Sequence, residues 1–329
     1  MNVELLYVHQ QTISCYSEEK PPKDGYLWLL IERSEEIDLK AWISKFTKKT
    51  FNERHVEDLK QQNHPSFYEA MSDYDLIILR SVSDLREGPK RVFPVSAFII
   101  FENVLITVYD KRDNALPRIR AVLTEQKRTV PLSTSVLAEF CLGFLVDRYL
   151  DIKQNIDSRL NLWQKKLLQI KSNASSVDWD ALLAFKTDVR RIRMLCEEQM
   201  DTINAWRTNM HLNTHHIGRD QQQQLLVNLN DVADHANRAF KLVTQSQQEL
   251  ESLMQLHFTI LSHRTNEIMR ILALVTCIFL PPGLITGIFG MNFTYVPEIA
   301  KRDGFYVVTL FMLLLSVGLW FFFKWRKWI

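Results

Sequence analysis

Residues 266–293 read NEIMRILALVTCIFLPPGLITGIFGMNF, and this stretch decides how the chain is organised. From Ile271 to Phe289 no residue is charged, and such a run of 19 residues is long enough to cross the apolar core of a bilayer. A second uncharged run of the same length, Phe305–Phe323, follows after a short loop. One such run could be a core helix of a soluble protein. Two in succession predict a transmembrane hairpin, with spans at about 267–290 and 304–324.

Basic residues flank the two ends of this hairpin. Arg270 precedes the first run, and Lys324, Arg326 and Lys327 follow the second. Because lysine and arginine are enriched on the cytoplasmic side of membrane proteins, both chain termini are expected in the cytoplasm. The sequence therefore predicts a multi-pass protein of the cytoplasmic membrane, with the loop between the spans facing outward.

That loop opens with Gly290, Met291 and Asn292, and Glu298 follows in its acidic part. At these residues the chain resembles the CorA family of two-helix divalent-cation channels, which carries Gly-Met-Asn at the outer end of its first transmembrane helix. The segment TNEIMRIL, Thr265–Leu272, is similar to the family's cytoplasmic pore entrance. The resemblance implies a homopentamer in which the first span lines the pore and the second lies outside it.

Composition argues against several other classes of function. The chain has 329 residues and a formal net charge of +2, and no basic patch with interleaved aromatic residues indicates a nucleic-acid partner. Its four cysteines are far apart, which favours reduced thiols in a cytoplasmic protein. No nucleophile, phosphate-binding loop or pair of carboxylates indicates an enzyme, and no prosthetic group is expected.

Residues 1–130 have the pattern of a cytoplasmic α/β or α+β domain. Short runs of β-branched or aromatic residues predict five strands, at Val3–Val8, Tyr26–Ile31, Leu76–Ser81, Ala97–Phe101 and Val104–Tyr109. Helices are predicted between or after these strands, at Glu35–Lys48, His55–Gln62 and Asn114–Arg128. A sheet covered by helices is the expected arrangement.

Residues 131–265 predict a long helical stalk, which residues 266–329 follow as the transmembrane hairpin. Two helices, from Pro131 to about 171 and from Asp178 to about 210, are expected to pack as an antiparallel pair. A third has no proline or glycine from Arg219 to Leu280, and its apolar residues recur at heptad-like steps. This seam consists of Leu225, Leu229, Val232, Ala236, Ala239 and Val243. Its partners are either the upstream helices or copies of the same helix, which together with the implied pentamer predicts a funnel.

Helical spacing places seven residues of the first span on one stripe. They are Asn266, Met269, Leu272, Thr276, Leu280, Gly283 and Gly287. In a ring of identical helices they would give a polar entrance, apolar constrictions that can gate by dewetting, and hydroxyls midway. With uncharged oxygens of Gly290 and Asn292 at the outer end, such a pore suits hydrated Mg²⁺, which gives up its waters reluctantly. The alternative is helix packing, for which the Gly283-x-x-x-Gly287 spacing is typical.

The segment Leu280-Pro281-Pro282-Gly283 departs from the family, which usually has one proline followed by leucine and a hydroxyl residue. Two prolines remove two backbone donors and are expected to kink the helix. Gly283 also lacks the hydroxyl that would face the ion. The departure bears on conductance and metal preference more than on architecture.

Regulation by ions is a second expectation that the resemblance carries, because the family senses metal through carboxylates between neighbouring cytoplasmic domains. Asp231 and Asp234 lie in a segment that resembles the family's stalk site. A carboxylate of the next subunit would complete the site, and the possible residues are Asp73, Asp75 and Asp84. Gln255 replaces a second acidic position of the stalk. The alternative is that these carboxylates are solvated on an exposed helix face.

Three functions remain open. The first is a channel for Mg²⁺, with Co²⁺ and Ni²⁺ as further cargo, in which divalent cations also act as regulatory ligands and the partners are the bilayer and copies of the chain. The second is a zinc transporter of the same architecture, with or without proton coupling. Met291 and Glu298 argue against it, since the related zinc branch usually has another residue in place of the methionine. The third is a non-conducting membrane-anchored scaffold, which Gly283 and Gln255 favour.

Overall fold

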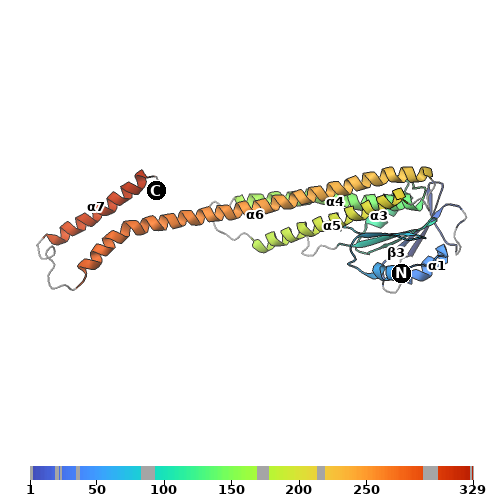
Figure 1. The fold of residues 1–329 in the computed structure, drawn as a ribbon, viewed down its shortest axis with the longest axis horizontal. Coiled ribbons are helices and arrows are strands. Elements are labelled where there is room, and N and C mark those ends of the chain that lie inside the picture. The colour runs from blue at the N-terminus through green and yellow to red at the C-terminus, as the bar shows by residue number, and fades with distance from the viewer. Residues whose placement is uncertain are drawn as a thin grey trace. The chain divides into compact units, whose positions relative to one another are not determined.

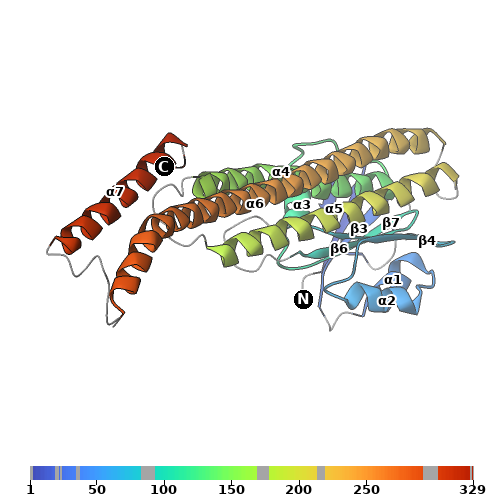
Figure 2. The same ribbon diagram turned by 60° about the vertical axis from the view of Figure 1, so that its left-hand side comes forward.

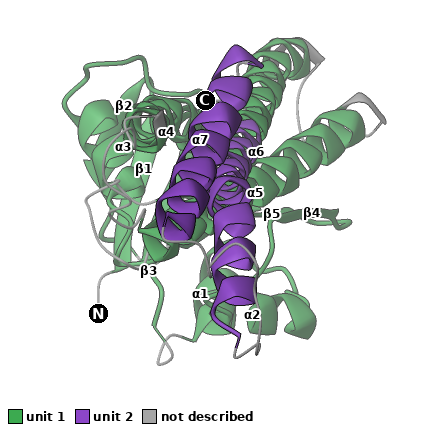
Figure 3. Ribbon diagram, turned by 90° about the vertical axis from the view of Figure 1, so that its left-hand side faces the viewer, with its two compact units in different colours: residues 1–251 green, residues 252–329 purple. Residues whose placement is uncertain are grey.

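Figures 1 and 2 show the computed structural model of the chain, which describes residues 3–18, 22, 24–34, 38–82, 93–168, 178–212, 219–291, 303–326 and 328. The chain divides into two compact units, Met1–Glu251 and Ser252–Ile329 (Figure 3). The predicted boundary between the α/β domain and the stalk, at residues 130 and 131, falls inside the first unit.

A seven-stranded sheet lies at the centre of the first unit, with the strand order β2-β1-β3-β7-β6-β5-β4. The strands are β1 (Val3–His9), β2 (Thr12–Cys15), β3 (Tyr26–Glu32), β4 (Phe67–Ala70), β5 (Asp75–Arg80), β6 (Val95–Ile100) and β7 (Val104–Tyr109). Neighbouring strands are antiparallel except β3 and β7, which run parallel. The strands β3, β5, β6 and β7 are buried over most of their length, because apolar clusters cover both faces of the sheet.

All five predicted strands are present, and two further strands occupy the edges of the sheet. These are β2 and β4, each four residues long and without a fully buried residue. Strands this short and this exposed have no alternating apolar pattern, so their sequences alone did not predict them. Their positions are set by pairing with β1 and β5.

Short helices cover one face of the sheet. These are α1 (Leu39–Thr47) and α2 (Glu53–Lys60), whose apolar residues pack on β3, β5, β6 and β7. Residues 35–37 of the helix predicted over 35–48 lie outside the described residues. α1 begins at Leu39, where the carboxylate of Asp38 accepts a hydrogen bond from the Ala41 N–H at 3.1 Å and caps the helix. On the opposite face lies α3 (Ala115–Thr124), which is four residues shorter at its C-terminal end than predicted.

The other face of the sheet is covered by three long helices. They are α4 (Thr134–Leu168), α5 (Trp179–Leu212) and the beginning of α6 (Arg219–Phe289). Figures 1 and 2 show α4 and α5 running in opposite directions, as predicted for this pair. Every residue of the predicted seam of α6 is buried, and its members pack on residues such as Leu142 of α4 and Trp206 of α5. The partners of this seam are therefore the upstream helices of the same chain.

The second unit consists of the last part of α6 and of α7 (Gly304–Trp325). Both helices contain a stretch that is long and apolar enough to cross a membrane. Pro281 and Pro282 lie inside α6, which changes direction near its C-terminal end but continues to Phe289 (Figures 1 and 2). The two spans touch, since Thr286 Oγ1 lies 3.6 Å from the sulfur of Met312.

Candidate functional site

The predicted stripe forms a continuous exposed face on the last part of α6. All seven of its residues, from Asn266 to Gly287, are exposed within the single chain. Its apolar members are well exposed: Met269 is 60% exposed, Leu272 58% and Leu280 62%. Large apolar side chains exposed to this degree along a helix indicate a surface that faces lipid or another protein chain.

The opposite face of the same helix is partly covered. Its buried or half-buried residues are Leu274, Ile278, Pro281, Pro282, Ile285 and Phe289. At 3.6 residues per turn these positions lie across the helix from the stripe. Because α7 touches this part of α6 through Thr286 and Met312, the hairpin leaves the stripe uncovered.

The glycine pair of the stripe does not serve packing between the described residues of this chain. A Cβ atom placed on Gly283 or on Gly287 would meet nothing within 4 Å. The Gly-x-x-x-Gly spacing therefore has no partner helix inside the described parts of the chain. It remains available for a pore wall or for contact with another copy.

The outer end of the first span is described as far as Met291. Gly290 N–H donates to the carbonyl of Thr286 at 2.9 Å and Met291 N–H to that of Ile288 at 3.3 Å, so the helix closes its last turn at this glycine. The side chain of Met291 is 57% exposed. Asn292 and Glu298, the other predicted residues of the outer loop, lie outside the described residues.

The predicted regulatory carboxylates lie on the exposed side of α6 in the first unit. Asp234 is exposed, and Asp231 Oδ1 lies 3.8 Å from Nε2 of His235, whose Nδ1 is 2.8 Å from Asp147. Among the described residues no group of three or more His, Cys, Asp or Glu side chains could hold a metal ion. Within the described parts of one chain, Asp231 therefore lies outside any such group.

A buried carboxylate lies close to Asp231. Glu139 of α4 is only 9% exposed and accepts a hydrogen bond from the side-chain amide of Asn228 at 3.1 Å. Burial raises the pKa of Glu139 to about 6, the Asn228 bond works against this rise, and the negative charge of Asp231 adds to it. Sequence reasoning did not find Glu139, since it lies in an apolar helix face with no motif around it.

The three carboxylates proposed as partners of Asp231 differ in availability. Asp75 is 9% exposed and accepts a hydrogen bond from the hydroxyl of Tyr68 at 3.0 Å. Asp73 is half-exposed and forms an ion pair with Lys49 at 3.0 Å. Asp84 lies outside the described residues. Of the two described partners, only Asp73 presents a carboxylate that a neighbouring chain could reach.

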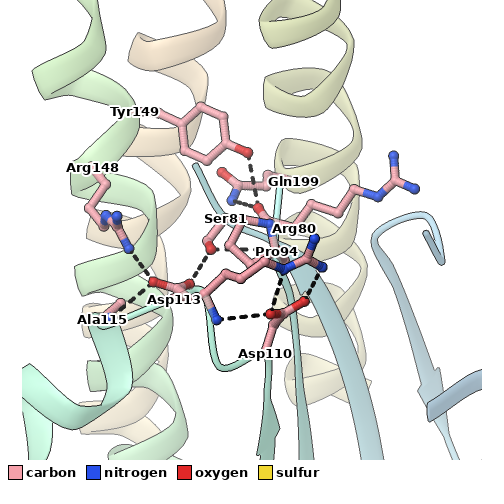
Figure 4. Close-up of polar contacts among 10 residues, drawn as sticks. Arg80, Ser81, Pro94, Asp110, Asp113, Ala115, Arg148, Tyr149 and Gln199 are labelled. Carbon is pink, nitrogen blue, oxygen red and sulfur yellow. Dashed lines mark hydrogen bonds and ion pairs between the residues drawn. The ribbon is translucent and has the colours of Figure 1, made fainter. Parts of the chain in front are cut away.

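A buried polar network connects the ends of inner strands of the sheet to the long helices α4 and α5 (Figure 4). The carbonyl of Arg80, the last residue of β5, accepts hydrogen bonds from Tyr149 of α4 at 3.0 Å and Gln199 of α5 at 2.8 Å. Beside it, fully buried Asp113 pairs with Arg148 of α4 at 2.6 Å and accepts a hydrogen bond from Ser81. The network joins segments that are far apart in sequence, which is why no local pattern predicted it.

Comparison with known proteins identifies the family. The model of the family described as CorA-like Mg²⁺ transporter protein matches residues 23–325. The cobalt/magnesium transport protein CorA of Thermotoga maritima is 22% identical over 286 residues, which cover 83% of this chain and 76% of that protein. Identity at this level is low, so the match of the family model carries the assignment.

Solved structures show the same fold. The CorA magnesium transporter of Methanocaldococcus jannaschii matches with a TM-score of 0.78 at 19% identity, over 100% of this chain and 99% of that one. The cytoplasmic domain of ZntB from Vibrio parahaemolyticus matches with a TM-score of 0.54 at 15% identity, over 77% of this chain and 97% of that one. From the family match over residues 23–325, this chain belongs to the CorA-like Mg²⁺ transporter family, and it is a divalent-cation transporter rather than an enzyme.

Proposed function

We propose that copies of this chain assemble as a homopentamer around the stripe of α6 and conduct hydrated Mg²⁺, with Co²⁺ and Ni²⁺ as further cargo. The observation that carries the proposal is the division of α6 into two faces. One face is partly covered beside α7, and the other is exposed from Asn266 to Gly287. A row of exposed neutral residues beside an ion-facing Gly-Met-Asn loop is what a shared pore requires.

The chemistry of the stripe supports a hydrated divalent cation. No residue from Ile271 to Met291 is charged, so no carboxylate of this segment would bind the ion directly and hold it too tightly to conduct. Thr276 donates its hydroxyl hydrogen to the carbonyl of Leu272 at 2.8 Å, which leaves the hydroxyl oxygen free to accept from ion-bound water. Oxygen acceptors that hold the hydration shell suit Mg²⁺, because its dehydration is slow and costly.

The orientation in the membrane follows from the basic ends of the hairpin. Arg270 lies at the start of the first span, directly before its uncharged run, and Lys324 and Arg326 lie at the end of the second. We infer that these ends lie at the cytoplasmic face of the cytoplasmic membrane and that the Gly290 loop faces outward. In this orientation Asp231, Asp234 and the next subunit's carboxylates would sense cytoplasmic ions and favour the closed ring when occupied.

The decisive test is ion flux into liposomes that contain the purified protein. Asn292→Ala removes the amide oxygen at the outer entrance, and Mg²⁺ flux is expected to fall to background. The matched control is Leu313→Ala, which shortens a 58% exposed residue of α7 and is expected to leave flux unchanged. Light scattering must show the same oligomer for both variants. Normal flux in correctly assembled Asn292→Ala contradicts the proposal.

Zinc transport is the second function with an observation in its favour. The fold of the first unit is similar to the cytoplasmic domain of ZntB, and the Pro281-Pro282-Gly283 segment departs from the magnesium pattern. Competition between Mg²⁺ and Zn²⁺ in the same liposomes separates the two functions. A proton gradient that drives Zn²⁺ uptake would indicate coupled transport, and absence of every divalent flux in an assembled ring would indicate a scaffold.

A further inference from the structure

A second polar site lies in the first unit, at the end of the parallel strands β3 and β7. Arg33 follows β3 directly, and its backbone N–H donates to the carbonyl of Tyr109, the last residue of β7, at 2.8 Å. Its side chain reaches helix α2, where Nη1 donates to the carbonyl of Gln61 at 3.2 Å. The carboxyl ends of parallel strands are a common place for ligand sites in sheets covered by helices.

Two nitrogens of this guanidinium have no acceptor among the residues that the structure describes. Nε and Nη2 of Arg33 are shielded from solvent and make no hydrogen bond to any described residue. The carboxylate of Asp110 interacts with Arg33 through its charge, but its hydrogen bonds are made with Arg112. Nε of Arg112 donates to Oδ1 at 2.9 Å and Nη2 donates to Oδ2 at 2.5 Å. Arg33 is half-buried, and shielded donors without an acceptor are costly, so these two nitrogens favour an anionic partner.

A pocket opens beside Arg33 between the sheet and the short helices. Its polar lining includes Arg33, Lys60 and Gln62, and its apolar lining includes Ile31, Leu39 and Leu59. Among the described residues that line it, two are cations and none is a carboxylate. Burial lowers the pKa of Arg33, and the negative charge of Asp110 partly offsets this lowering, as a further anion in the pocket would.

We propose that this pocket binds a phosphate group, as the free ion or as the end of a phosphate ester. Nε and Nη2 of Arg33 point along one edge of the guanidinium and match two oxygens of a phosphate, which is the bidentate geometry that arginine supplies. Lys60 adds the second positive charge, and the amide of Gln62 can donate to a third oxygen. This site is separate from the ion path and does not depend on the proposed pore.

The test is thermal unfolding of the purified full-length protein in metal-free buffer, with phosphate compared with chloride at equal ionic strength. Phosphate is expected to raise the unfolding midpoint of the wild type saturably. Arg33→Gln is expected to weaken the apparent affinity by about tenfold or more, since it removes charge-assisted hydrogen bonds. The matched control is Arg54→Gln, an exposed arginine of α2 outside the pocket, which is expected to bind like the wild type.

Lys60→Gln serves as a second variant, because Lys60 is exposed and its replacement does not depend on how the core tolerates loss of Arg33. A weaker phosphate response in Lys60→Gln supports the proposal. ADP in place of phosphate distinguishes the sources: a tighter response to ADP that needs Arg33 assigns a phosphate ester, and an equal or weaker one assigns the free ion. The proposal is overturned if the wild type gives no saturable response, or if Arg33→Gln responds like Arg54→Gln.

Discussion

Helix α6 has two apolar faces with different surroundings. In the first unit its seam from Leu225 to Val243 is buried, and the covering residues come from α4 and α5 of the same chain. In the second unit Met269, Leu272 and Leu280 of the same helix are about 60% exposed. Both segments repeat apolar residues at helical spacing. Periodicity of this kind identifies the face of a helix that packs against something. Which helix, chain or lipid packs on that face depends on the rest of the fold.

The largest effect is expected from a substitution that fills the exposed face of α6. Gly287→Leu adds a large side chain where a single chain offers open space, so the fold of the chain is expected to be unaffected. In a ring the same side chains would meet at the pore or between copies, and Mg²⁺ flux is expected to fall to background. Flux and light scattering measure the effect, with Gly318→Leu on α7, also in open space, as the control. Unchanged flux in Gly287→Leu would show that the stripe does not line the pore.

The next effect concerns the buried face of the first unit. Arg148→Met leaves fully buried Asp113 without its cation, which is expected to cost about 3–5 kcal/mol of unfolding free energy. Denaturant unfolding followed by circular dichroism measures it. Lys153→Met is the control on the same helix, since its i, i+4 pair with Asp157 is part-exposed and worth less than about 0.5 kcal/mol. An equal loss of unfolding free energy in the two variants would show that the buried network in Figure 4 stabilises the fold no more than a part-exposed ion pair does.

The same substitution, leucine to alanine, at one buried and one exposed position of α6 tests whether the two faces differ in packing. Leu229 is fully buried, so Leu229→Ala is expected to cost about 2–5 kcal/mol of unfolding free energy. Leu272→Ala, at a 58% exposed position, is expected to cost less than about 1 kcal/mol, and to increase flux because it widens a predicted constriction. If both changes destabilise the protein equally, the exposed face of α6 is packed within the chain and the distinction fails.

The smallest effect is a dependence of stability on pH. The pKa of Glu139 is raised from 4.5 to about 6 in the folded chain, so the native state binds this proton more tightly than the unfolded state. Its contribution to stability therefore grows as the pH falls through 6 and is complete below 4.5. Glu139→Gln is expected to stabilise the protein by about 1–2 kcal/mol at pH 7 and to flatten the profile between pH 4.5 and 7. Exposed Glu57→Gln is the control, and an unchanged profile in Glu139→Gln would contradict the prediction.

The sequence predicted the parts of the fold that depend on local pattern. The buried strands β3, β5, β6 and β7 follow from apolar runs, and the apolar residues predicted as the second span lie in the helix α7. The edge strands β2 and β4 were not predicted, because pairing with β1 and β5, and not their own residue pattern, sets their positions. The start of α1 depended on a single cap at Asp38.

The proposed sites divide in the same way. The stripe of α6 was proposed from spacing, because all its residues lie on one helix. The Arg33 pocket could not, since Arg33, Lys60 and Leu39 come from three segments that only the folded sheet brings together. The raised pKa of Glu139 could not be predicted from the sequence either, because it depends on the residues that bury the carboxyl group in the fold.

Pro281 and Pro282 leave one helical turn of the first span without some of its backbone hydrogen bonds. Since proline has no N–H, the peptide oxygen of Ile278 has no donor at i+3 or at i+4, and that of Cys277 has none at i+4. The bonds that would resist bending at this point do not exist, so the helix can pivot there at little energetic cost. Any water or hydroxyl that reaches these two oxygens would stabilise one bent form, which makes this turn the most pliable part of the span.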